Sequence, residues 1–340
     1  MLANLMKLKY SIGSRILMAE NKEIAKNFNP KIPASYRLYY FLRPFIPRGI
    51  QIFLRQQIVN IKKTKISDVW PIDDNIGNPS VEWYGWPQSM KFAVILMHDV
   101  DTQIGHDKCI QLMDIEEELG FKSAFNIVPE RYRVSDYLIE EIKKRKFGLG
   151  VHGLKHDGKL FLSERRFRER AQKINFYLEN WNTKGFSSPS MHCNLSWMKY
   201  LNIDYATSTF DTDPFEPQPC GVKYILPFWV DNFESGKRYL EMPYTLAQDF
   251  TLFILMKEKN NSMWKKKTEY IANRGGMLLL NTHPDYMNFS GEKLKKEEYD
   301  INLYIEFLKW LKYKFRDKFW KALPSDVESF MKNRAIDELD

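Results

Sequence analysis

Acidic and histidine side chains follow three short apolar runs of the sequence, at residues 92–97, 148–151 and 277–280. Five such side chains stand out: Asp99, Asp101, His152, His156 and His283. Short, continuously apolar runs are typical of parallel strands covered on both faces, and the carboxyl ends of such strands hold the active sites of α/β proteins. We therefore expect these side chains to meet at one edge of a parallel sheet, as they would in an enzyme.

The pairs Asp99/Asp101 and His152/His156 contain the ligand types that Zn²⁺ and similar divalent ions accept. Two imidazoles and one carboxylate leave one position open for water, and water bound to such an ion ionises near neutral pH. The second aspartate is then available to accept the proton. This pattern predicts hydrolysis by an activated water, with Zn²⁺, Co²⁺ or another divalent ion as the cofactor.

Five polar segments follow one another between Lys91 and Pro284. They are Asp99/Asp101, His152/His156, residues 185–190, residues 208–213 and residues 278–284. Their order resembles that of the polysaccharide deacetylase family (NodB-homology, carbohydrate esterase family 4-like). His-x-x-x-His alone is a weak signal, whereas five segments in the family's order are specific. The resemblance implies a hydrolase that removes N-acetyl groups from a carbohydrate.

The resemblance also implies a role for each of the five side chains. Asp99 is similar in position to the family's general base, and Asp101, His152 and His156 to its metal ligands. His283 is similar in position to the general acid that protonates the leaving amine. Alternation places both aspartates on the same side of an extended segment, so the reverse assignment of base and ligand stays open.

Three further residues are candidates for supporting roles. The backbone N–H of Ser190 occupies the position of the family's oxyanion donor, and a main-chain donor does not depend on the side chain. Asp211 or Asp213 is expected to orient His283, because a carboxylate on the far ring nitrogen raises the pKa of an imidazole toward that of a useful acid.

The sequence departs from the family at Ser187, where the third segment usually carries an arginine that pairs with the base. A hydroxyl cannot replace that charge, although Arg131 or Arg133 could supply it from elsewhere. On this reasoning Ser187→Arg is expected to raise activity. Two alternatives remain: a catalytically impaired carbohydrate-binding homologue, and an amidase that acts on a non-sugar amide.

Each candidate also has an ordinary structural interpretation. The two aspartates could cap a following helix, and the histidines could be plain loop or strand-end residues. The complete ordered set favours a site. We expect His98 to have a structural role and His192 to lie in a pocket wall or loop.

Residues 89–340 are expected to form the barrel domain, because apolar runs alternate there with amphipathic stretches. Helices are predicted at 110–119, 137–146, 163–181, 263–273, 301–313 and 324–331, and further strands at 124–128, 203–209 and 239–243. The alternation indicates an α/β fold with a parallel barrel, and the resemblance implies the irregular (β/α)7-type barrel of the NodB-homology fold. The last two helices are expected to cover it.

Residues 1–88 are predicted to be a basic, largely helical N-terminal extension. Residues 1–66 hold thirteen Lys and Arg against two Glu, a formal charge of +11, whereas the whole chain carries +8. Ile50, Leu54, Ile58 and Ile61 lie on one helical face. This face could rest on an anionic membrane, or the extension could pack against the barrel.

The composition indicates which classes of partner and which cellular compartment to expect. No recognised nucleic-acid motif accompanies the basic charge, so a nucleic-acid partner is not expected. No apolar run approaches the length of a membrane span, and the three cysteines are unclustered, which fits a reducing compartment. We expect a cytoplasmic protein, peripheral to the inner membrane face if the basic region binds lipid. Its substrate would then be a glycan or a lipid-linked sugar intermediate of polysaccharide biosynthesis, and the oligomeric state is left open.

Overall fold

The structure is a computed structural model that describes residues 42, 45–66, 70–74, 83, 85–216, 220–231, 236–316 and 318–337. Expectations for residues 1–41 lie outside the described residues, and the division of the chain after residue 88 stays a prediction. None of the helices in the described part is both long enough and apolar enough to cross a membrane.

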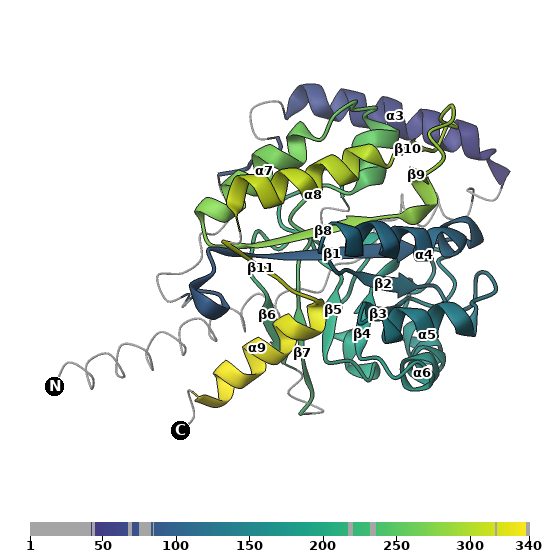
Figure 1. The fold of residues 1–340 in the computed structure, drawn as a ribbon. Helices are drawn as coiled ribbons and strands as arrows, with labels where there is room; N and C mark the ends of the chain where they lie inside the picture. The colour runs from purple at the N-terminus through teal and green to yellow at the C-terminus, as the bar shows by residue number, and fades with distance from the viewer. Residues whose placement is uncertain are drawn as a thin grey trace.

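Seven parallel strands form the centre of the described structure (Figure 1). In spatial order they are β8 (Met277–Thr282), β1 (Phe92–Val100), β2 (Ala124–Ile127), β3 (Gly148–His152), β4 (Gly185–Ser187), β5 (Tyr205–Thr207) and β7 (Arg238–Glu241). The antiparallel strand β6 (Phe228–Asp231) pairs with β7, and the short strand β11 (Phe319–Lys321) pairs with the start of β1. The predicted irregular (β/α)7-type barrel is confirmed.

Helices cover the outside of this sheet because each presents one apolar face to it. They are α4 (Gln103–Glu118), α5 (Asp136–Lys144), α6 (Glu164–Asn180), α7 (Ser262–Asn273), α8 (Asn302–Phe315) and α9 (Pro324–Asp337). The strands are buried on both faces, and every residue of β1 is buried. The predicted helices are present, although α4 begins seven residues earlier than position 110, directly after the N-cap residue Thr102.

Short elements connect the strands and helices. They are the 3₁₀ turns Pro87–Ser89, Pro189–Met191, Trp197–Tyr200 and Pro284–Tyr286, the π-helix Phe250–Leu255, and the strand pair β9 (Met287–Asn288) and β10 (Tyr299–Asp300). Two of the turns follow β4 and β8 directly, so they lie at the carboxyl edge where the candidate residues were expected.

Helix α3 (Arg48–Lys65) lies outside the barrel, along the top of the molecule in Figure 1. Its residues Gln51, Ile52, Gln56 and Val59 are buried. The Gln56 amide donates to the carbonyl of Ile254 in the π-helix at 2.9 Å. This part of the N-terminal extension therefore packs against the barrel.

Candidate active site

The three predicted metal ligands converge at the carboxyl edge of the sheet. Asp101 follows β1, His152 ends β3, and His156 lies in the loop after β3. Each offers one ligand atom, and these atoms all lie within 4.8 Å of one another. The Oδ1 atom of Asp101 is 3.5 Å from Nε2 of His152 and 3.2 Å from Nε2 of His156. The expected convergence of these three side chains is therefore present.

The bonding of Asp101 fits a cation at this point. Its Oδ1 atom is buried and accepts no hydrogen bond from the residues that the structure describes. Burial alone would raise the pKa of this carboxyl, but the two adjacent histidines bring it well below its usual range. A buried carboxylate oxygen that faces two imidazole nitrogens is suited to bind an ion with them. Together with two imidazole nitrogens it forms the donor set of a three-ligand zinc-type site.

The contacts of Ser187 also favour metal binding, because they orient the ring of His152. Its hydroxyl lies 3.1 Å from Nδ1 of His152 and donates to Oδ1 of Asp99 at 3.2 Å. Because that hydroxyl hydrogen points to Asp99, its oxygen is free to accept a hydrogen from Nδ1. The Nε2 lone pair of His152 then faces Asp101, which is the tautomer that a metal requires.

Arg131 makes the one contact that opposes metal binding among these residues. Its guanidinium lies 2.9 Å from Nδ1 of His156. A guanidinium only donates, so this contact needs a lone pair on Nδ1 and leaves the hydrogen on Nε2, the atom that faces Asp101. Arg131 has to release His156 for a metal to bind there. It therefore does not supply the missing cation to Asp99.

Asp99 is held by neutral donors instead of an arginine. The amides of Asn126 and Asn281 each donate to one of its oxygens at 2.8 Å, and Ser187 adds the third contact. Asn126 lies directly opposite Asp99 in the pairing of β1 with β2. Within the described residues no arginine or lysine forms an ion pair with Asp99. Three neutral donors thus fix the carboxylate's position without adding charge.

Gly150 leaves the space that Asn126 needs. A Cβ atom at position 150 would lie 2.3 Å from Oδ1 of Asn126, closer than real atoms approach. Any larger residue would push Asn126 away from Asp99. This explains one glycine of the segment that precedes His152.

His283 is held by Asp249, which lies just before the π-helix. Nδ1 of His283 is 2.7 Å from the Asp249 carboxylate, and the backbone N–H of His283 donates to the same carboxylate at 2.8 Å. Burial disfavours the charged ring, but Asp249, Asp101 and Asp99 together raise the pKa of His283 to about 10. His283 is therefore protonated at neutral pH and has the charge state of a general acid.

The orientation of His283 differs from the sequence prediction. Asp211 forms a buried ion pair at 2.6 Å with Lys267 of α7, which neutralises its charge. Asp213 accepts from the backbone N–H of Phe215 at 2.8 Å. Neither of the two occupies the Nδ1 side of His283, which Asp249 takes. The prediction that Asp211 or Asp213 orients His283 is wrong on this geometry.

Ser190 and Asp285 lie in the turns that border the site. Ser190 lies in the turn after β4 with a left-handed backbone, φ 59°, and its oxyanion role stays a prediction. Asp285 accepts from the backbone N–H of Asp101 at 3.0 Å and from the hydroxyl of Thr102. Burial and the Asp101 charge raise the pKa of Asp285 to about 6. Asp285 thus ties the end of β1 to the turn that follows His283.

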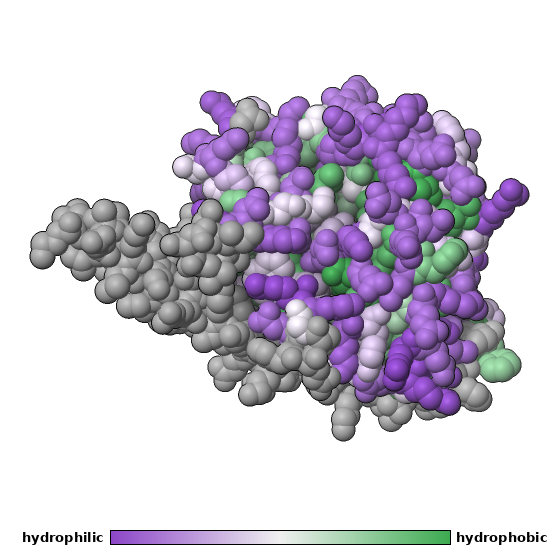
Figure 2. Space-filling view, turned by 90° about the horizontal axis from the view of Figure 1, so that it is seen from below, coloured by the Kyte–Doolittle hydropathy of each residue, from purple (hydrophilic) through white to green (hydrophobic). Residues whose placement is uncertain are grey.

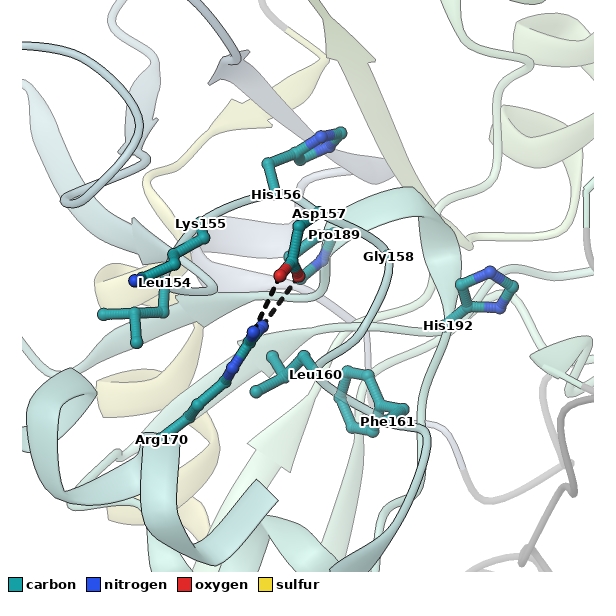
Figure 3. A pocket seen from close by; sticks show the side chains of 10 residues that line it. All are labelled: Leu154, Lys155, His156, Asp157, Gly158, Leu160, Phe161, Arg170, Pro189 and His192. Atoms are coloured by element: carbon teal, nitrogen blue, oxygen red, sulfur yellow. Dashed lines mark hydrogen bonds and ion pairs between the residues drawn. The ribbon is translucent and has the colours of Figure 1, made fainter. Parts of the chain in front are cut away.

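A pocket opens beside His156 (Figure 3). Its free space is about 10 Å³, room for about one water molecule, and it lies between the loop after β3 and the turn after β4. One wall carries a bidentate ion pair of Arg170 with Asp157 at 2.7 Å, and His192 lies at the other end. The expectation that His192 lines a pocket is confirmed. Figure 3 shows Leu160 and Phe161 on the floor between them.

His98 has the structural role expected of it. It is fully buried, and its two ring nitrogens lie 2.8 Å from Thr282 and from Glu116. Ser123 and Tyr304 also donate to Glu116. This network joins β1, β8, α4 and α8 away from the metal ligands.

Sequence reasoning missed the four polar residues that support the site, Asn126, Asn281, Asp249 and Asp285. A signal existed for Asn126 and Asn281, because each is an isolated amide inside an otherwise apolar strand. Asp285 lies two residues after His283. Asp249 had no comparable signal, since it precedes no strand and its contact with His283 depends on the tertiary fold.

Replacing Asp249 tests the charge of His283. Asp249→Asn keeps the shape of the side chain but removes the charge that raises the pKa of His283. The acid form is then lost at lower pH, so the alkaline limb of the pH–rate profile should move down by roughly 1–3 units. Tyr299→Phe is the matched control, because it removes one donor at 3.1 Å from Asp249 and leaves the charge. An unchanged alkaline limb in Asp249→Asn would exclude His283 as the acid.

Ser187 is fully buried among His152, Asp99 and Tyr244, which changes the expectation for an arginine there. Ser187→Arg should lower the free energy of unfolding by about 1–3 kcal/mol or more, because it overpacks the core and buries a charge. Thermal unfolding measures this.

Ser187→Ala removes the acceptor for Nδ1 of His152. It should weaken metal affinity by roughly 10–100-fold, the usual effect of losing a partner behind a metal ligand. Ser188→Ala is the control, since Ser188 bonds Ser208 at 2.7 Å instead. A Ser187→Arg enzyme that is more active and as stable as the unaltered chain would contradict the expected loss of stability and the role of Ser187 behind His152.

No family model and no curated protein matches the chain. Solved structures do, and two of them have a TM-score above 0.5. A protein provisionally identified as a polysaccharide deacetylase, from Mycobacterium smegmatis, aligns with a TM-score of 0.54 at 15% identity, over 74% of this chain and 93% of that one. Puue allantoinase aligns with a TM-score of 0.54 at 14% identity, over 77% of this chain and 95% of its own. At such identities the similarity defines the fold: the chain has the NodB-homology fold of the polysaccharide deacetylases.

Proposed function

We propose that this protein is a metal-dependent hydrolase that removes N-acetyl groups from a carbohydrate. The observation that carries the proposal is the constellation of Asp101, His152 and His156 with Asp99 beside it. His283, in contact with Asp249, completes it as the acid. Its fold resembles that of the mycobacterial protein, whose description names a deacetylase.

A divalent ion held by Asp101, His152 and His156 would supply an ionisable water and polarise the acetamide carbonyl. Asp99, kept in place by neutral donors, is positioned to accept a proton from a water molecule at the site. The backbone N–H of Ser190 donates to the oxyanion. His283 protonates the leaving amine while Asp249 holds its ring.

We further propose a glycan or a lipid-linked sugar intermediate as the substrate, in the cytoplasm at the inner membrane face. All three cysteines are free and buried, which fits a reducing compartment.

Acetate release tests the proposal. The purified intact chain, loaded with Zn²⁺ or with Co²⁺, is incubated with N-acetylated oligosaccharides and with N-acetylated sugars carried on a lipid. We expect acetate and a free amine in equal amounts, and their loss in the His152→Ala variant. If no N-acetylated sugar releases acetate while the metal still binds, the carbohydrate-binding homologue replaces the deacetylase.

An amidase on a non-sugar amide is the second candidate. It is favoured by a structural similarity to Puue allantoinase as high as that to the mycobacterial protein. Allantoin and simple amides are therefore included as substrates in the same assay. Ring opening of allantoin, or amine release from the simple amides, without acetate from any sugar, would decide for the amidase.

A further inference from the structure

The outer face of helix α3 carries a row of exposed apolar side chains. Ile50, Phe53, Leu54, Ile58 and Ile61 are each between 48% and 64% exposed. Their spacing places them on one side of the helix, and together they are called the α3 outer stripe. Exposed apolar residues normally occur singly, whereas a contiguous row marks an interaction site.

The opposite side of α3 is fixed to the barrel. Ile52 and Val59 are buried, and Gln56 bonds the π-helix. Two ion pairs, Arg48 with Glu297 and Lys63 with Glu258, fasten the two ends of the helix. The basic residues of this inner side are therefore occupied by the barrel. The outer stripe is held facing away from it, so changes to the stripe leave the packing intact.

The charges around the outer stripe are complementary to an anionic surface at the C-terminal end of α3. Helix α3 contains no Asp or Glu. Exposed Lys65, Lys257 and Lys259 lie near that end with one carboxylate, Glu258, whereas at the other end Lys293, Lys295 and Lys296 stand among Glu292, Glu297 and Glu298. Lys296 lies 3.5 Å from the carbonyl of Gly49, and Leu294 beside it is 47% exposed. An apolar row flanked by lysines is the pattern of helices that lie in a membrane interface.

Not every face of the molecule has this character. Figure 2 views the molecule from below, the side away from α3 in Figure 1, and where residues are described that face is mostly hydrophilic. Its hydrophobic areas lie between polar residues. A row of apolar side chains bordered by lysines thus distinguishes the α3 side from this one.

Helix α3 is linked to His283 through two aromatic rings. The guanidinium of Arg55 is 4.8 Å from the centre of the Phe250 ring. The rings of Phe250 and Tyr286 are 4.8 Å apart, and those of Tyr286 and His283 are 5.3 Å apart. A surface seated on the outer stripe would therefore be separated from His283 by α3 and these two rings.

We propose that the α3 outer stripe docks into the surface of an anionic lipid bilayer, with the flanking lysines on the headgroups. The apolar row supplies insertion and the lysines supply electrostatic attraction, the two contributions that stable peripheral binding requires. The inference goes beyond the proposed function, because it holds whether or not the chain is a deacetylase. Together the two point to a membrane-borne N-acetylated sugar as the substrate.

Vesicle binding by the intact chain tests the docking. The vesicles contain equal parts of phosphatidylglycerol and phosphatidylcholine, with pure phosphatidylcholine as the reference. We expect binding to the anionic vesicles that weakens as salt rises toward physiological strength, where the Debye length is about 8 Å. Phe53→Ser with Ile58→Ser should reduce binding by roughly tenfold or more, since two inserted side chains are lost.

Matched variants separate docking from general surface effects. Tyr137→Ser with Phe176→Ser changes two side chains of similar exposure, 62% and 60%, on α5 and α6, and should bind as the unaltered chain does. Lys293→Glu with Lys296→Glu should reduce binding to anionic vesicles only. Thermal unfolding of each variant checks that α3 still packs.

Three results would overturn the proposal. The first is an intact chain that ignores anionic vesicles at low salt. The second is unchanged binding in the folded Phe53→Ser/Ile58→Ser variant, because another segment would then carry it. The third is a chain that is dimeric without lipid and becomes monomeric in this variant, which would make the outer stripe an interface between two copies. None of these results depends on acetate release.

Discussion

Replacement of both His152 and His156 by alanine is expected to abolish metal binding. Two of the three ligands are then absent, and the remaining carboxylate of Asp101 cannot hold a divalent ion selectively. Elemental analysis of protein purified without added metal measures the effect. The unaltered chain should carry about one divalent ion, as a single three-ligand site implies.

His192→Ala provides the control for this experiment. His192 is also a buried histidine and lines the adjoining pocket, but it lies outside the group of three ligands. Its loss should leave the metal content unchanged. Full occupancy in the double alanine variant would refute the site.

Asp99→Asn is expected to retain the metal and to lose turnover by roughly 10²–10⁴-fold, the usual contribution of a general base. The substitution keeps the volume of the side chain. It can also keep a hydrogen bond to Asn281, because Oδ1 of Asn281 is buried without a partner and the amide can turn. Turnover per bound metal is the quantity to compare.

Glu116→Gln is the matched control for Asp99→Asn. Glu116 is an equally buried carboxylate that bonds His98 and lies outside the group of three ligands. Folded Glu116→Gln enzyme should keep its turnover, even if it unfolds more easily. Should Asp99→Asn instead empty the metal site, the roles of Asp99 and Asp101 are the reverse of those assigned.

The sequence predicted the barrel and the three metal ligands because both depend on local pattern. Apolar runs identify buried strands, and the carboxyl ends of parallel strands necessarily share one edge. Asp101, His152 and His156 had only to follow such runs to be brought together. The helix that follows β1 was placed too late, since Thr102 and the polar first turn of α4 carry little apolar periodicity.

Partners that depend on tertiary packing could not be read from the sequence. Asp211 lies in the expected segment, but it forms a buried ion pair with Lys267 of α7. No spacing rule predicts this pair. Asp249 replaces Asp211 beside His283. From the sequence, Ser187 seemed to leave Asp99 without the partner that an arginine would provide. The structure shows that the amides of Asn126 and Asn281, which come from two other strands, hold Asp99 in position but add no charge. Sequence could not show this, because the strands are brought together only by the fold.

The arrangement of strand β1 also bears on how the chain folds. Its residues His98 and Asp99 bond Thr282 and Asn281, which lie 184 and 182 positions further along, and its start pairs with Phe319 in β11. Contacts so distant in sequence form late, because much conformational entropy is lost before they add stability. The surroundings of Asp99 are therefore among the last parts to assemble, and in a nascent chain the edge of β1 that pairs with β8 stays open until residue 282 has been made. Slow folding and a risk of aggregation during synthesis follow from this topology.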